Sequence, residues 1–144
     1  MSVKLDDIVT YLEGRFATIA KYANSIAYTS AENELKNVKA FGVRIYPPKD
    51  GVVEYRNRHI GPILTEIFTV NVDIVIKKAF KTDRQSVSDA DGISAEIESV
   101  KLLLLHNRNS ETFRDAWWSP GKPYELGGSI IVPGTFVAEV QNEY

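Results

Sequence analysis

The sequence predicts an α+β protein, in which a mainly antiparallel β-sheet has two helices packed on one face. The strongest observation is FTVNVDIVIKKAF over residues 68–80, where apolar residues occupy every second position, as is typical of a half-buried strand. The second is helical periodicity near residues 3–26 and 88–107, and the third is a closing region of short strands separated by Gly and Pro. At 144 residues the chain suits a single domain, 1–144.

The first element is an amphipathic helix near the N-terminus. Ser2 is the expected N-cap, and Asp6 and Asp7 suit the positive end of the helix dipole. Gly14 weakens the helix by about 1 kcal/mol relative to alanine, so the pattern is one helix or two joined there. The helix is expected to end between Lys21 and Ser30. Its apolar residues recur at three- and four-residue spacing: Leu5, Ile8, Leu12, Phe16, Ile19, Ala23 and Ile26.

A strand over Val38–Tyr46 follows and is ended by two prolines, Pro47 and Pro48. The next polar stretch contains the turn dipeptide Asp50-Gly51 between apolar residues. The sequence therefore predicts a loop at about residues 47–63 that projects from the body as a short hairpin. The long alternating strand comes next.

The second helix is expected over Ser88–Asn107, with Ser88 as N-cap. One apolar stripe runs along it, and further leucines widen that stripe, so the helix is expected to lie between the sheet and a second layer or another subunit. The stripe consists of Ile93, Ile97, Val100 and Leu104, widened by Leu102, Leu103 and Leu105.

The closing region predicts a strand over Thr112–Trp118 and a Pro- and Gly-rich turn over Ser119–Pro123. Two further strands are expected over Ser129–Val132 and Thr135–Gln141, on either side of Pro133-Gly134. No internal repeat or low-complexity linker divides the chain.

Composition excludes several classes of protein. The formal net charge of -2 gives no global attraction to nucleic acid or anionic lipid, and the absence of cysteine excludes disulfides and thiolate sites. The longest apolar run, Leu102–Leu105, cannot span a bilayer, so no membrane association is expected. Asp6 and Asp7 stand where a secretory peptide needs apolar residues, so export is not expected either.

One segment fits part of a calcium-binding loop. Asp89, Asp91, Gly92 and Glu98 match its third, fifth, sixth and twelfth positions, but the first position is Val87, which cannot be a ligand. N-terminal capping of the second helix explains the same acidic residues.

The chain lacks the nucleophile-elbow, Walker and dinucleotide-binding signatures. Its two histidines, His59 and His106, have no partner at metal-ligand spacing. The sequence therefore predicts no catalytic, cofactor-binding or metal site, and a protein that is not an enzyme.

Two groups of residues suit contacts with a partner. The residues of the projecting loop include arginines that suit phosphate contacts or simply solvated charge. If extended, the adjacent tryptophans must point to opposite faces of a strand, and tryptophan and arginine are enriched at interface anchors. The alternative is that one tryptophan lies in the core and the other is covered by the Pro-rich turn. The candidates are Tyr55, Arg56 and Arg58 in the loop and Arg114, Trp117 and Trp118 in the closing region.

The order of elements resembles the tail terminator, or tail-completion, proteins of long-tailed bacteriophages, including the lambda-type terminators. The resemblance rests on an opening amphipathic helix, a strand ending in RIYPP, a long loop, the strand FTVNVDIVIKKAF, the capped helix SDADGISAEIESVKLLLL and closing strands. It covers most of the chain and is one of layout and length.

The resemblance implies a structural virion protein of the tail or neck, assembled in the host cytoplasm. Such subunits form a ring, usually a hexamer, that caps the tail tube and joins it to the head-tail connector. DNA would pass through the ring without specific recognition, and no cofactor is implied. A small ligand-binding or regulatory α+β domain remains the alternative, with its pocket between the sheet and the Ser88–Asn107 helix, and an enzyme is third.

Overall fold

The computed structural model of the chain describes residues 4–19, 22, 26–27, 41–46, 53–58, 63–77, 90–105, 113 and 115–143. These residues form two helices and one sheet of eight strands, so the predicted α+β class is confirmed. The helices are α1 (Leu5–Ala17) and α3 (Ala90–Leu105). The strands are β1 (Ile26–Ala27), β2 (Phe41–Tyr46), β3 (Val53–Arg58), β4 (Ile63–Lys77), β5 (Asp115–Pro120), β6 (Tyr124–Leu126), β7 (Ser129–Val132) and β8 (Gly134–Glu143).

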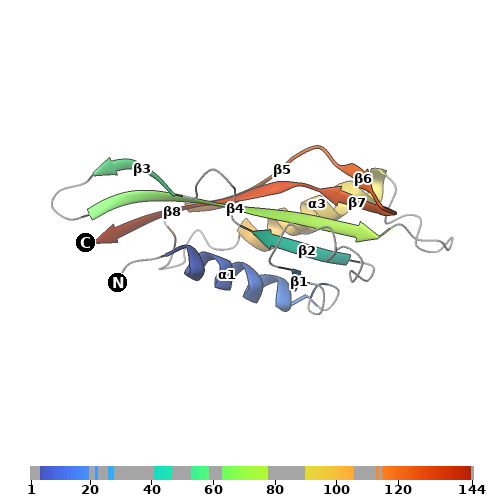
Figure 1. Cartoon of the computed structure of the whole chain (residues 1–144), viewed down its shortest axis with the longest axis horizontal. Coiled ribbons are helices and arrows are strands. Elements are labelled where there is room, and N and C mark those ends of the chain that lie inside the picture. The colour runs from blue at the N-terminus through green and yellow to red at the C-terminus, as the bar shows by residue number, and fades with distance from the viewer. Residues whose placement is uncertain are drawn as a thin grey trace.

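Strand β4 is the axis of the sheet and runs along its length (Figure 1). It begins at Ile63 rather than at Phe68. The sequence did not indicate this earlier start, because Glu66 interrupts the apolar alternation that marks the strand. The predicted alternation is confirmed. Every second side chain is buried against the helices, namely Phe68, Val70, Val72, Ile74 and Ile76.

Each edge of β4 pairs with two strands in succession. On one edge β3 lies opposite Leu64–Phe68 and β2 lies opposite Asn71–Ile76. On the other edge β8 lies opposite Ile63–Asn71 and β7 lies opposite Ile74–Lys77. Strand β5 pairs with β8, and β6 pairs with β7. One end of the sheet therefore has the order β3–β4–β8–β5, and the other has the order β1–β2–β4–β7–β6.

Both helices pack on the same face of this sheet, as predicted. Ile8, Leu12 and Phe16 of α1 share one core with Val100 and Leu104 of α3 and with the apolar row of β4. The opposite face carries the other side chains of the strands and is called the open face below, because both described helices pack on the other one. Some of its side chains are nevertheless buried, among them Val75 and Ile131. All described strand pairs are antiparallel except β1 with β2, which is parallel.

Helix α1 is shorter than its periodicity suggested. It ends at Ala17, so the predicted end between residues 21 and 30 is wrong, and it passes through Gly14 as one helix. Ser2 is not the N-cap. Lys4 is, and its backbone N–H donates a 2.8 Å hydrogen bond to the carboxylate of Asp7. In a capping box, the side chain at the third helical position accepts a hydrogen bond from the backbone N–H of the N-cap residue, and Asp7 does so here.

The segment predicted to project as a loop includes a strand of the main sheet. Val53–Arg58 forms β3 and pairs along β4, because apolar and charged residues alternate there well enough to complete an edge strand. Asp50-Gly51 lies outside the described residues. Figure 1 shows that β3 and the adjoining ends of β4 and β8 extend beyond both helices, so this end of the sheet does stand out from the helical layer.

Two long-range contacts join the helical layer. The Arg15 guanidinium donates hydrogen bonds of 2.8 and 3.3 Å to the Leu103 carbonyl in the last turn of α3. A cation is stabilising there, because the C-terminal end of a helix is the negative end of its dipole. The Tyr22 hydroxyl donates to the buried carboxylate of Glu96. Leu102 is 58% exposed and lies outside the apolar stripe that it was expected to widen.

The closing region forms a long hairpin. Strand β5 ends at Pro120, so part of the predicted turn belongs to it, and β6 was not predicted. Gly127 and Gly128 connect β6 to β7 with φ angles of 56° and 80°, which favour glycine in a two-residue turn. The predicted strands β7 and β8 are confirmed, with β8 extending over Gly134–Glu143.

Candidate functional site

The candidate site lies where the ladder between β4 and the closing strands is interrupted. Ile74 lies opposite Val132 and Asn71 lies opposite Thr135, so β7 and β8 follow β4 in one continuous register. Only Pro133 separates the two strands. Proline has no backbone N–H, so the hydrogen-bond ladder between β4 and the closing strands is interrupted there. Backbone groups of neighbouring residues must then find other hydrogen-bond partners.

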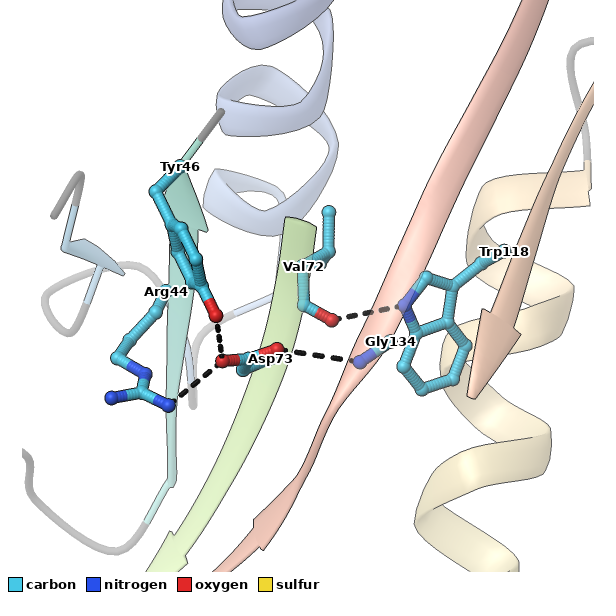
Figure 2. A network of polar contacts seen from close by, with 6 residues as sticks. All are labelled: Arg44, Tyr46, Val72, Asp73, Trp118 and Gly134. Carbon is cyan, nitrogen blue, oxygen red and sulfur yellow. Dashed lines mark hydrogen bonds and ion pairs between the residues drawn. The ribbon is translucent and has the colours of Figure 1, made fainter. Parts of the chain in front are cut away.

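Asp73 supplies one of these partners. Its Oδ1 accepts a 3.3 Å hydrogen bond from the backbone N–H of Gly134, which therefore bonds a side chain rather than the β4 backbone. Its Oδ2 accepts 2.7 Å hydrogen bonds from the Arg44 guanidinium and from the Tyr46 hydroxyl (Figure 2). One carboxylate thus joins β2, β4 and β8 at the interruption.

Trp118 supplies the second partner. Its indole Nε1–H donates a 3.0 Å hydrogen bond to the Val72 carbonyl (Figure 2). The ring reaches this carbonyl because residue 134 is glycine. A Cβ on Gly134 would lie 2.7 Å from Cε2 and 2.9 Å from Cζ2 of the indole, and closer still to Nε1. The absence of a side chain at residue 134 is therefore what admits the tryptophan.

Arg44 and Asp73 form a buried ion pair on the open face. They lie directly opposite each other on β2 and β4, their N–O distance is 2.7 Å, and their side chains are 6% and 3% exposed. The guanidinium carbon also lies 5.9 Å from the centre of the Tyr46 ring. Nε of Arg44 is buried without a hydrogen-bond partner among the described residues. Removal of either partner alone would strongly destabilise the fold, because it would leave a buried charge without a partner.

Tyr46 is held in its neutral form. Burial is the largest cause, followed by the hydrogen bond to Asp73, and together they raise the pKa of Tyr46 to about 12. The phenol therefore acts as a hydrogen-bond donor at neutral pH. Asp73 accepts three hydrogen bonds within the chain, so the two residues present binding groups rather than a free base and nucleophile.

A pocket of about 320 Å³ opens on the open face at this interruption. Asp73 and Tyr46 line one side, Asn71 and Thr135 lie in the next row, and Ser119 contributes from the outer strand. This pocket lies on the opposite face from the one expected between the sheet and α3.

The predicted interface residues fall at several places. Trp117 and Trp118 point to opposite faces as predicted, with Trp117 36% and Trp118 5% exposed. Trp118 has little surface to offer a partner, because its ring is in the core. Tyr55, Arg56 and Arg58 belong to β3, at the sheet edge opposite β5. Arg114 lies outside the described residues.

Other residues weighed for chemistry add no site. His59, His106 and Asp89 lie outside the described residues. Within the described ranges, no three His, Asp or Glu side chains gather as metal ligands, and no helix has the length and apolarity to cross a bilayer.

The Asp73 network was not predicted from the sequence. Asp73 occupies a polar position of the alternating segment, where a half-buried strand would expose it to solvent, yet it is 2% exposed. A signal was present, because Arg44 is the one charged residue within FGVRIY and aligning that strand with β4 pairs it with Asp73. Comparison of the chain with protein-family models finds no match, and comparison with curated proteins finds none either.

Proposed function

We propose that the protein is a structural subunit that self-associates into a ring, the hexamer of a bacteriophage tail terminator, at the junction of tail tube and head-tail connector. The order of elements that suggested this family in the sequence is compatible with the α+β fold described above. DNA would pass through the ring without specific recognition, and the ring would belong to the tail or neck of the virion.

One observation carries the proposal: the predicted interface residues of the loop and the predicted interface residue Trp117 lie on opposite edges of one sheet. At the end of the sheet with the order β3–β4–β8–β5, Tyr55, Arg56 and Arg58 are on β3 and Trp117 is on β5. A closed ring needs two different surfaces per subunit, each complementary to the other. Two distinct edges of one sheet meet that requirement.

The β5–β6 edge also exposes apolar surface. Trp117, Tyr124 and Leu126 are 36%, 44% and 37% exposed, and together they form what we name the apolar edge. Trp117 alternates with the core residues Ala116 and Trp118, so it faces the open face. Exposed aromatic residues on a strand with one described neighbour are typical anchors of a subunit contact.

Light scattering after size-exclusion chromatography tests the proposal, together with negative-stain images of the protein mixed with tail tubes. We expect a hexameric mass, or rings at tube ends if assembly needs the tube as template. Leu126→Ser should reduce assembly, because it removes part of the apolar edge. Leu102→Ser is the control, since it removes an even more exposed leucine from α3, away from the apolar edge. A protein that stays monomeric at high concentration and decorates no tube end would overturn the proposal.

A further inference from the structure

We propose that the pocket at the Pro133 interruption binds a neutral sugar ring of the pyranose class. This inference goes beyond ring assembly and does not depend on it. The chemistry of the pocket walls, the aromatic side chains beside it and its size carry the inference in turn.

The pocket walls offer uncommitted neutral polar groups. The side chains of Asn71, Ser119 and Thr135 form no hydrogen bond with other residues in the described part of the chain. One amide and two hydroxyls supply both donors and acceptors at one place. Vicinal hydroxyls, which are donors and acceptors as well, match such a set.

The electrostatics of the pocket favour a neutral ligand. Its one carboxylate, Asp73, is balanced by Arg44 at 2.7 Å. An anion would meet that carboxylate, and a cation would compete with a guanidinium already in place. The remaining lone pairs of Asp73 can still accept a hydrogen bond from a ligand hydroxyl.

Aromatic side chains flank the pocket on both sides along the outer strands. Trp117 is two residues before Ser119 on β5, so both side chains face the open face in adjacent rows. Tyr124 lies opposite Ile131, which is two residues before Pro133, so it lies on the other side of the pocket. Sugar rings combine hydroxyls with faces of C–H groups, and those faces pack against aromatic rings that have polar groups beside them.

The size of the pocket limits the ligand. Its volume of about 320 Å³ is near the lower end of the roughly 300–1,000 Å³ typical of small-molecule sites. It therefore suits a single ring, with any further residues of a longer saccharide outside.

Saturation-transfer NMR and titration calorimetry test the inference, with D-glucose, D-galactose and N-acetyl-D-glucosamine as probes. We expect saturation transfer to at least one sugar, with an affinity in the millimolar range. Thr135→Val and Ser119→Ala should each weaken binding roughly three- to tenfold, as the loss of one hydrogen bond predicts. Thr10→Val, at an exposed position on α1, is the control and should leave binding unchanged.

Trp117 and Tyr124 of the apolar edge lie beside this pocket. Binding is therefore measured on dilute protein that light scattering shows to be monomeric, or on the Leu126→Ser variant. That variant should keep wild-type sugar affinity even where it loses assembly, and Ser119→Ala should do the reverse. Failure of ring formation and failure of sugar binding are thereby separate results. Absence of transfer to all three sugars, or equal binding by wild type and both pocket variants, overturns the inference.

Discussion

Replacing Gly134 with alanine tests the central packing argument of the sheet. The new methyl group would overlap the Trp118 indole, because its Cβ would lie 2.7 Å from Cε2 and 2.9 Å from Cζ2. The indole must then move, and its 3.0 Å hydrogen bond to the Val72 carbonyl would be lost. Both groups are in the interior, where water does not readily replace the missing partner.

The expected loss combines two effects. Overpacking in a well-packed core costs about 1–3 kcal/mol, and an unsatisfied buried polar group costs about 1–3 kcal/mol more. We therefore expect Gly134→Ala to lower the free energy of unfolding by roughly 2–6 kcal/mol. For a chain of this length, that corresponds to a decrease in Tm of about 7–20 °C.

Urea unfolding followed by tryptophan fluorescence, and calorimetry, measure this loss. Gly14→Ala is the matched control, because a Cβ at this exposed position of α1 meets nothing within 4 Å. It should raise the stability by about 0.5–1 kcal/mol. The effect of Gly134→Ala should shrink when Trp118 is already phenylalanine. A Gly134→Ala variant as stable as wild type would refute the packing argument.

Three further predictions concern the buried polar groups. Asp73→Leu alone should lower the free energy of unfolding, measured in urea, by about 3–5 kcal/mol. Adding Arg44→Met should recover much of this loss, because no buried charge is then left unpaired. A double variant as unstable as Asp73→Leu would contradict this. Because the folded pKa of Tyr46 is about 12 against an ordinary 10.0, its contribution is complete below about pH 10 and lost as pH rises toward 12. Tyr46→Phe should reduce that alkaline loss in urea midpoints, and an unchanged pH dependence would argue against it. Tyr22→Phe removes the hydroxyl bonded to Glu96 and should cost about 1–3 kcal/mol in thermal unfolding, so a neutral result would exclude a stabilising role for that contact.

The sequence predicted the elements whose pattern is set by one buried face. The alternating residues of β4 and the stripe of α3 at Val100 and Leu104 were found because each repeats with the period of its own secondary structure. The two helices on one face follow from the same apolar rows. Helix α1 was overextended because the apolar spacing continues to Ile26, although the chain leaves the helix at Ala17 and reaches β1 there.

The candidate site was not predictable from local pattern. Asp73 occupies a polar position of its strand, and only the register between β2 and β4 reveals that Arg44 is the partner of its buried charge. Gly134 resembles an ordinary turn residue after Pro133, and only the indole of Trp118, from another strand, explains why a side chain is excluded there. Such contacts join residues far apart in the sequence, so periodicity carries no information about them.

The shared register of β7 and β8 limits how this chain can change in length. Adding or deleting one residue at Pro133 would shift all of Gly134–Glu143 by one position and turn Phe136, Ala138 and Val140 out of the interior. Between β5 and β6 the spacing already differs, since Pro120 pairs with Gly134 but Tyr124 pairs with Ile131. Related chains should therefore tolerate insertions between residues 120 and 124 and keep a constant length across residue 133.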